Sequence, residues 1–559
     1  MNDVANWEVV VDASVQGLLN SKREDYSGLM THEKSVRTER TYSKRDAVGN
    51  LHVYWSKKPH ALIRQYVEAF SRPGDVVFDP FLGSGATALA ALSTGRKFVG
   101  GDLSHAATFV ARATIRPVDL EKLKEAHERL ARAVERRINE LYLTRCRECG
   151  HWAAANYFRW EKVFACECGV EVRLSSPPTC GGGARRPSRC PSCSRPFRAR
   201  KALVSKELLV GVHYSCQNCG SRNLAAEPTS DDVQVASRVS RKEILDADPL
   251  AAQSLPKNSQ IGVVGDDETL LDMFTPRTWR SLRILHAGIA AEADPALREQ
   301  LTLAFTSVLY NCSKMAQDNP RGGGIAIKGT LYRPPFFRER NPWVAFNYKF
   351  TRHTLPGKRA VASLLPAGAF GNCAIMTRPA QDYGVLPDES VDYAFTDPPY
   401  GESVPYLEVN RIMTAWLGKV DDVTREIVVT RRANDPRGRD SWLAGIREAF
   451  SEVYRVLKPG RWLTITFRHK DPKAWALLDR TIQGDLFAGG RKVGFVRSPR
   501  VATISGRQLT YKQLTSKKTV RGDAVVNYLK PAGKANNLTH VYESSLTPAG
   551  TSRARSLRA

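Results

Sequence analysis

Hydrophobic positions early in the chain follow first a helical and then a strand period. After Pro59, apolar side chains recur on one helical face, at Leu62, Ile63, Tyr66, Val67 and Phe70. A strand at 76–78, a glycine-rich turn, a helix at 86–92 and a second strand at 98–100 come next. This succession predicts a βαβ unit.

A long amphipathic helix is predicted after the βαβ unit. Asp119 is a good N-cap, and apolar residues then keep helical spacing at Leu120, Leu123, Leu130, Val134, Ile138 and Leu141. From Asn372 onward, strands and helices alternate again in the segments CAIM, VDYAF, WLAGIREAFSEVYRVL and RWLTITF. The segments VGFVRSPRV and DAVVNYL are predicted to close the sheet as an antiparallel pair.

These patterns divide the chain into six parts. They are a polar arm (1–48), one α/β half (49–143), a cysteine-rich insertion (144–225), a helical and then basic region (226–365), a second α/β half (366–532) and a basic tail expected to be disordered (533–559). The predicted fold class is therefore α/β, with a doubly wound sheet that is split by the inserted regions.

Composition narrows the class of partner. The chain has 559 residues, too many for a single core, and a formal net charge of +26. Such an excess of cations favours a polyanion such as nucleic acid, although a merely basic soluble protein would share it. No run of about 18 apolar residues occurs, so we expect no membrane span. The N-terminus does not have the pattern of a signal peptide.

The turn in DPFLGSGATALAAL has the features of a nucleoside-cofactor site. Gly83 and Gly85 carry no side chain where the chain must turn tightly and approach a ligand. Asp102 stands at the end of the next strand, where a βαβ unit places an acid for ribose hydroxyls. An ordinary turn is the alternative, but the strand, helix and acid together favour the cofactor.

The segment TDPPYG ends the strand VDYAF abruptly, because prolines cannot donate ladder hydrogen bonds. The Asp397 carboxylate and the Pro398 carbonyl could accept both N–H groups of an exocyclic base amine and draw its lone pair out of the ring. Tyr400 offers an aromatic face for an extruded base. A strand ended by a proline turn is the structural alternative.

Both segments resemble the amino-methyltransferases of DNA, which methylate N6 of adenine or N4 of cytosine with S-adenosylmethionine. The glycine turn is similar to that family's cofactor loop, TDPPYG to its catalytic loop and WSKKPHALIRQYV to its third cofactor motif. GRKFVGGDLS resembles the strand with the ribose acid, and VLKPGRWLTITFRHK resembles the segment that supports the catalytic loop. One departure is Ala86, where the family often has threonine; Thr87 matches the next position.

The resemblance implies a seven-stranded methyltransferase sheet and assigns roles to single residues. Catalysis falls to Asp397, Pro398, Pro399 and Tyr400, and cofactor binding to Lys58, Pro59, Asp79, Pro80, Phe81, Gly83, Gly85 and Asp102. The cofactor half precedes the catalytic half, and some classes with this order place their DNA-recognition domain in the gap, here expected within 226–365.

Eight cysteines of the insertion form four close pairs. The sequential pairing gives one Zn²⁺ site from Cys146, Cys149, Cys166 and Cys168 and a second from Cys190, Cys193, Cys216 and Cys219. Cys180 and His213 are alternative ligands, because the CxC spacing of the first site is atypical. We expect one or two structural ions rather than redox pairs. The isolated Cys312 and Cys373 are expected in the core.

Two basic stretches are candidates for phosphate contact, although charge runs are usually just solvated. The first lies between the cysteine pairs and contains Arg185, Arg186, Arg189, Arg195, Arg198, Arg200 and Lys201. The second is 319–350, where Arg321 and Gly322–Gly324 are predicted to face the substrate and Trp343, Phe346 and Phe350 to form core. The stretch 301–350 also resembles an insertion in some zinc-ribbon DNA methylases.

The sequence thus predicts a cytoplasmic enzyme that flips a base of double-stranded DNA and methylates its amine directly, with adenine N6 favoured. Methylation of cytosine N4 or of an RNA base is the alternative. A zinc-ribbon nucleic-acid-binding protein with an inactive methylase core is a third interpretation. The sequence leaves a restriction or defence partner open.

Overall fold

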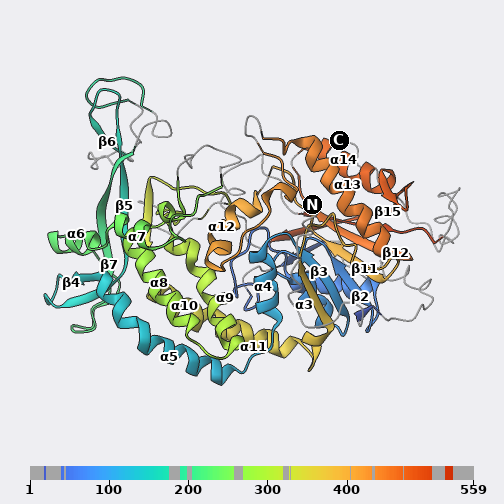
Figure 1. Ribbon diagram of the computed structural model, residues 1–559, viewed down its shortest axis with the longest axis horizontal. Helices are drawn as coiled ribbons and strands as arrows, with labels where there is room; N and C mark the ends of the chain where they lie inside the picture. The colour runs from blue at the N-terminus through green and yellow to red at the C-terminus, as the bar shows by residue number, and fades with distance from the viewer. Residues whose placement is uncertain are drawn as a thin grey trace.

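The computed structural model describes residues 18–19, 39–42, 46–174, 189–197, 204–256, 268–318, 327, 329–402, 404–430, 435–469, 471–506 and 523–532. Most of the expected N-terminal arm, the C-terminal tail and the loop with Arg321 and Gly322–Gly324 lie outside these residues. Figure 1 shows a sheet domain on the right, a helical region in the centre and a long β arm on the left.

The main sheet is mixed and mostly parallel. Its eight strands have the order β1-β15-β16-β12-β11-β2-β3-β10, and β16 alone runs antiparallel to its neighbours β12 and β15. Their bounds are β1 Glu39–Tyr42, β2 Val76–Asp79, β3 Lys97–Asp102, β10 Cys373–Thr377, β11 Val391–Thr396, β12 Leu457–Phe467, β15 Val496–Gly506 and β16 Asp523–Leu529. The predicted antiparallel pair is confirmed, while the strand count is one more than the expected seven.

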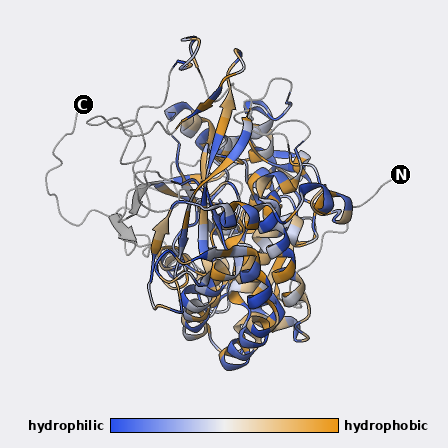
Figure 2. Ribbon diagram, turned by 90° about the vertical axis from the view of Figure 1, so that its left-hand side faces the viewer, coloured by the Kyte–Doolittle hydropathy of each residue, from blue (hydrophilic) through white to orange (hydrophobic). Residues whose placement is uncertain are grey.

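Helices cover both faces of this sheet because its strands bury side chains on both sides. Val77 packs into a cluster with helices α2 (His60–Phe70), α3 (Ala86–Leu92), α4 (His105–Ile115) and α11 (Leu355–Leu364). Val76 and Phe78 point the other way, toward α13 (Arg439–Val456) and α14 (Pro472–Gly484). Figure 2 shows hydrophilic and hydrophobic residues mixed along the helices, as expected where each helix buries one face.

After α4, the chain leaves the sheet and builds the helical region and the arm before it returns at α11 and β10. This part begins with α5 (Leu120–Asn139), where the Asp119 carboxylate accepts hydrogen bonds from two backbone N–H groups of the first turn. The predicted apolar face of α5 is buried, whereas Leu141 lies beyond the helix end. The shorter helices α6 (Ser230–Ser237) and α7 (Arg241–Ala247) follow later, and the hairpin of β13 (Leu486–Ala488) and β14 (Arg491–Val493) lies beside α13.

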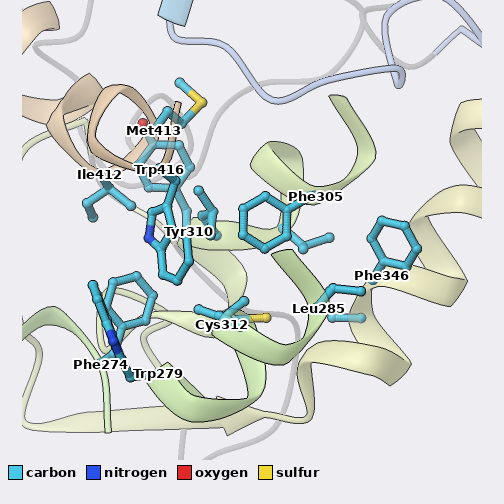
Figure 3. Close-up of a cluster of buried hydrophobic side chains, with 14 of the residues drawn as sticks. Phe274, Trp279, Leu285, Phe305, Tyr310, Cys312, Phe346, Ile412, Met413 and Trp416 are labelled. Atoms are coloured by element: carbon cyan, nitrogen blue, oxygen red, sulfur yellow. The ribbon is translucent and has the colours of Figure 1, made fainter. Parts of the chain in front are cut away.

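A second hydrophobic core joins the helical region to the catalytic half of the chain. It is formed by α8 (Pro276–Ala290), α9 (Pro295–Cys312), α10 (Pro342–Lys349) and α12 (Tyr406–Trp416). Figure 3 shows Trp416 of α12 among Trp279, Phe305 and Tyr310, and the Trp279 and Trp416 ring centroids are 4.9 Å apart. Trp343, Phe346, Phe350 and Cys312 are buried in this core and Cys373 in the sheet domain, as predicted.

The arm is an antiparallel sheet centred on β5 (Trp152–Ala165). Its other strands are β4 (Leu143–Arg145), β6 (Glu171–Arg173), β7 (Val204–Tyr214), β8 (Leu224–Ala226) and β9 (Phe336–Arg340). β9 pairs with β5 from far along the sequence and ties the arm to the helical region. Among the described helices, none is long and apolar enough to cross a membrane.

Candidate active site

Three acids stand where parallel strands of the sheet end. β2, β3 and β11 run in the same direction, and Asp79, Asp102 and Asp397 lie at or directly after their carboxyl ends. Ligands of open α/β sheets bind at this edge. The fold therefore brings the acid of the catalytic segment to the same edge as the two acids of the cofactor segment.

The turn after β2 requires glycine at two positions. Gly83 and Gly85 have φ values of +53° and +84°, in the left-handed region that side chains disfavour. A Cβ on Gly85 would lie 2.8 Å from the Ala111 Cβ atom, so α4 packs directly on the turn. The Gly83 N–H donates to Asp102 at 2.9 Å, which fixes the turn against the end of β3.

Asp79 connects the two halves of the sheet domain. Its carboxylate accepts hydrogen bonds from the Thr87 hydroxyl at 2.7 Å, the Thr396 hydroxyl at 2.7 Å and the Phe81 N–H at 3.0 Å. Burial raises the pKa of Asp79 to about 7, although these three hydrogen bonds oppose the shift. Burial likewise raises the pKa of Asp102 to about 6, against bonds from Ser104 and Gly83.

Asp397 lies in a network of charge and hydrogen bonds that the sequence did not predict in full. It pairs with the Lys58 amine at 2.9 Å and accepts from the Thr466 hydroxyl at 2.7 Å and from the Tyr400 hydroxyl. The same amine contacts Asp523 at 3.2 Å and the Tyr400 hydroxyl at 2.6 Å. Burial favours the neutral amine, but Asp397 and Asp523 outweigh it and raise the pKa of Lys58.

The aromatic residue of the catalytic segment is buried. Tyr400 is only 9% exposed, and its ring meets Phe467 edge-on at 5.1 Å. Burial and the neighbouring Asp397 raise the pKa of its hydroxyl well above the ordinary value. Pro398 is also buried, and the Trp442 indole N–H donates to the Pro399 carbonyl at 3.1 Å, which holds the segment in place.

A single cleft of about 920 Å³ joins the two segments. Of the predicted site residues, it is lined by Lys58, Asp79, Pro80, Phe81, Gly83, Asp102, Asp397 and Pro399. Pro59 and Gly85 line a smaller neighbouring cavity of about 380 Å³ instead. Pro398 and Tyr400 do not line the cleft and lie behind Asp397 and Pro399.

Several lining residues carry no motif and were missed. Tyr54 and Tyr406 stack with ring centroids 6.3 Å apart, one from before α2 and one from the start of α12. Glu426 is also in the wall, and burial raises its pKa to about 7 against the Leu407 N–H and the charge of Arg437. Thr466 and Asp523, which contact Asp397 and Lys58 rather than line the cleft, were missed too.

The residues that line the cleft have the polar and apolar groups that S-adenosylmethionine requires. The carboxylates of Asp79 and Asp102 offer acceptors for amino and ribose hydroxyl groups, and Phe81 offers an apolar surface. The bare backbone at Gly83 leaves space beside Tyr54, which a Cβ atom would approach to 3.1 Å. Residues of this type therefore fit a nucleoside cofactor with a cationic centre.

The eight paired cysteines form two compact clusters that could each hold a metal ion. One contains Cys146, Cys149, Cys216 and Cys219, and the other Cys166, Cys168, Cys190 and Cys193. Closest Sγ–Sγ distances between their pairs are 3.6–3.8 Å. Four thiolates about 2.3 Å from one Zn²⁺ would lie roughly 3.8 Å apart, so the spacing suits tetrahedral zinc.

The predicted sequential pairing of these cysteines is wrong. β5 has 14 residues and separates Cys149 from Cys166, a distance of about 45 Å along an extended strand. Because β7 returns antiparallel to β5, Cys216 and Cys219 come back to the base of the arm, while Cys190 and Cys193 stay at its tip. His213 belongs to neither cluster, and Cys180 lies outside the described residues.

The basic stretch between the cysteine pairs is described only in part. Arg189 and Arg195 flank the tip cluster, and Arg189 donates to the Ser194 carbonyl at 2.9 Å. The described part of the chain does not include Arg185, Arg186, Arg198, Arg200 and Lys201. Phosphate contact by this stretch stays a prediction.

Comparisons with known proteins agree with the cofactor half of the cleft. A family model described as DNA methylase, of the N6 and N4 type, matches residues 14–111. DNA adenine methyltransferase YhdJ of Escherichia coli K12 is 45% identical over 49 residues, 9% of this chain and 17% of that protein. A second protein of that strain, named "Putative methylase YubD", is 42% identical over 55 residues, 10% of this chain and 24% of that protein.

The chain spans less than a quarter of the length of these relatives. A crystal structure titled as that of a possible exported protein from Bordetella parapertussis aligns over 33% of this chain and 52% of that chain, with 14% identity and a TM-score of 0.14. The matched segment contains the turn with Gly83 and Gly85 and the acids Asp79 and Asp102. Across residues 14–111, the chain carries the signature of the DNA amino-methyltransferase family.

Proposed function

We propose that this protein uses S-adenosylmethionine to methylate an exocyclic amine of a base in double-stranded DNA, with N6 of adenine as the favoured acceptor. The observation that carries the proposal is the single cleft lined both by the glycine turn with Asp79 and Asp102 and by Asp397. A cofactor half and a catalytic half that face one cleft can bring a methyl donor and an amine together.

The first half would hold the cofactor. Asp102 would accept from the ribose hydroxyls, and Asp79 and Phe81 would contact the rest of the molecule. Lys58 would line the same part of the cleft, with its amine engaged by Asp397 and Asp523. When bound, the cofactor supplies an electrophilic methyl group on a sulfonium.

The second half would prepare the amine. Asp397 would accept one of its N–H bonds, and the Pro398 carbonyl, which does not line the cleft in this structure, would have to turn toward the base to accept the other. The nitrogen lone pair would then leave conjugation and be free to attack the methyl carbon. Methyl transfer would form a nitrogen–carbon bond as the carbon–sulfur bond breaks and leaves a neutral thioether, and the extra proton of the methylated amine would pass to water. Lys58 and the Thr466 hydroxyl would hold the Asp397 carboxylate in place while this happens. Pro399 would hold the backbone rigid.

Tyr400 would stack on the extruded base. Because its ring is packed against Phe467, it must rotate toward the cleft when the base enters. The stacked pair of Tyr54 and Tyr406 already stands in the cleft wall and would border the base.

The arm would carry two structural zinc ions, one at its base and one at its tip, in the clusters described above. The net charge of +26 supports a DNA partner, and such a substrate would place the enzyme in the cytoplasm with the nucleoid. Cytosine N4 is the second candidate acceptor, because the matching family model covers both N6 and N4 enzymes.

The test is the identity of the methylated nucleoside. The full chain would be incubated with S-adenosylmethionine carrying a labelled methyl group and with duplex DNA, tRNA or rRNA, followed by digestion and mass spectrometry. We expect labelled N6-methyladenine from DNA. N4-methylcytosine would support the second candidate, label confined to RNA would overturn the choice of DNA, and label in no nucleic acid would overturn the function.

Asp397→Asn is the matched control for that experiment. The change keeps the shape of the side chain and removes its negative charge, so we expect unchanged cofactor affinity by calorimetry and methyl transfer slowed by about 100-fold or more. A variant that still transferred at the wild-type rate would show that Asp397 has no part in the reaction.

A further inference from the structure

A second hollow lies next to the cleft and is not explained by cofactor binding. It has a volume of about 1060 Å³ and shares Tyr54, Ser56 and Lys57 with the cleft wall. On its other side it is lined by residues of α9, β9 and α10 and of the turn that follows α10. It therefore lies between the cofactor half and the inserted regions.

The hollow is strongly cationic. Lys57, Arg340, Lys349 and His353 line it together with the exposed ring of Tyr348, and none of its described lining residues is acidic. Within the part of the chain that the structure describes, Lys57, Arg340 and Lys349 form no ion pair with a carboxylate. The Lys349 amine instead donates to the Asn50 carbonyl at 2.7 Å and that of Lys57 to the Gly49 carbonyl at 3.3 Å.

The charges in this hollow repel one another. Burial, followed by the charge of Lys57, lowers the pKa of Lys349 to about 8. Burial lowers the pKa of Lys57 to about 8 as well, although Asp46 opposes the shift. Burial and Lys349 also lower the pKa of His353. Buried cations without an acid partner are costly, so an anion bound here would relieve their repulsion.

Arg340 connects the hollow to one face of the arm. In the β5–β9 pairing it lies opposite Tyr157, and Arg338 lies opposite Arg159, so all four side chains share a face. The guanidinium of Arg338 is 4.9 Å from the centre of the Tyr157 ring. His213, opposite Tyr157 on β7, stacks on that ring with centroids 4.3 Å apart.

This face has both phosphate-binding and stacking groups. Asp318 pairs with Arg159 at 2.7 Å and with Arg338 at 2.6 Å, so one carboxylate holds the two guanidinium groups side by side on this face. Basic side chains beside aromatic rings on a sheet suit a nucleic-acid strand, whose phosphates bind the cations and whose bases stack. The face and the hollow form one basic path that ends at the cleft.

We propose that Arg340, Lys349 and Lys57 bind phosphates of the DNA strand whose base enters the cleft, and that the Tyr157, Arg159, His213 and Arg338 face guides the same strand along the arm. The inference rests on the proposed function, because that function requires the DNA strand to run along the arm toward the cleft. It goes beyond that function in naming the phosphate site, which lies in the hollow rather than in the basic stretches singled out from the sequence.

The test measures DNA affinity as a function of salt. A fluorescent duplex oligonucleotide is titrated with the full chain, in the presence of a non-reactive S-adenosylmethionine analogue, and anisotropy is followed between 0.05 and 0.5 M salt, a range spanning about one decade. Arg340→Gln and Lys349→Met each remove one cation. We expect each to lower the slope of log affinity against log salt by about one and to weaken binding about fivefold near 0.15 M salt.

Matched variants separate a local site from folding and from net charge. Lys349→Arg and Arg340→Lys keep the charge and should retain most of the slope. Arg480→Gln removes an exposed cation from α14, away from the hollow, and should leave the slope unchanged. Calorimetry with the cofactor analogue checks that each variant is folded, because the analogue binds in the cleft rather than in the hollow.

The outcomes are distinct from those of the nucleoside experiment. Wild-type affinity and slope in both Arg340→Gln and Lys349→Met would overturn the phosphate site, even if methylation were found. An equal loss in Arg480→Gln would also overturn it, because the effect would then belong to net charge. A reduced slope without any methyl transfer would keep the phosphate site and refute the enzymatic proposal.

Discussion

At the scale of single residues, the Lys58 amine connects the side chains around Asp397. It reaches Asp397, Asp523 and the Tyr400 hydroxyl within 3.2 Å, although it belongs to the cofactor half of the sequence. The amine therefore lies between two carboxylates, and Asp523 is also 3.8 Å from the Arg468 guanidinium. In the proposed reaction, Lys58 would position Asp397 as well as line the cleft.

Replacing Lys58 should destabilise the fold more than replacing Asp523, one of its two acid partners. Lys58→Met leaves Asp397 without its cation and Asp523 with only Arg468 at 3.8 Å, so we expect the free energy of unfolding to fall by about 3 kcal/mol. Asp523→Asn should cost less, because Asp397 still pairs with the amine. Denaturant unfolding of the two single variants and the double variant should give a coupling energy of roughly 0.5–3 kcal/mol. A coupling near zero would contradict the ion pair.

Cofactor affinity should rise with pH. Asp79 has a pKa of about 7 and Asp102 of about 6 in the folded protein, both raised by burial. The folded state therefore holds these protons more tightly than the unfolded state, and the contribution of each group to stability is lost as pH rises toward its folded pKa. The ionised forms are the better acceptors for a cationic cofactor, so binding should strengthen from pH 6 to 8.

Isothermal titration of S-adenosylmethionine across that pH range measures the effect. Asp79→Asn is the control, because an amide cannot titrate and the remaining pH dependence should then centre near pH 6, on Asp102. Affinity that fell with rising pH in the wild-type protein would contradict the assignment of these acids to the cofactor.

At the scale of elements, local patterns predicted much of the structure. The helix after Pro59, the βαβ unit and α5 follow from hydrophobic periodicity and an N-cap, because each element is specified by its own residues. The metal clusters did not follow, because their pairing depends on the length and antiparallel return of β5 and β7. Cysteine spacing alone contains no information on that path.

Zinc content distinguishes the two pairings. In the structure Cys149 shares a cluster with Cys216, and Cys166 belongs to the other cluster. Cys149→Ser with Cys216→Ser should therefore lose one of two ions, and Cys149→Ser with Cys166→Ser should lose both. Metal analysis of the purified variants gives the result. The reverse pattern would restore the sequential pairing.

At the scale of the whole molecule, the two halves of the cleft meet because of long-range strand pairing. β3 lies next to β10 although the entire arm and helical region intervene, and β9 joins the arm from the far side of that insertion. The resemblance of the motifs predicted that Asp79, Asp102 and Asp397 serve one reaction, and strand pairing places them at one edge of the sheet. Thr466 and Asp523, which contact Asp397 and Lys58, and Glu426 in the cleft wall could not be predicted, since only the assembled fold brings these distant positions together.

The same assembly links the catalytic segment to the inserted region. α12 begins six residues after Tyr400 and buries Ile412, Met413 and Trp416 in the helical core. A displacement of the helical region would therefore move the chain directly beyond the catalytic loop. Through α12, the basic path along the arm and the hollow is physically connected to the segment that would receive the base.

The most direct measurement is photolabelling of the cleft. An S-adenosylmethionine analogue with a photoreactive group in place of the transferable methyl is bound and irradiated, and the labelled peptides are identified by mass spectrometry. The account predicts label on the segment 395–407, suppressed by excess S-adenosylmethionine, because Asp397 and Pro399 face the same cleft as Gly83. Label that is suppressed in this way but confined to other parts of the chain would contradict it.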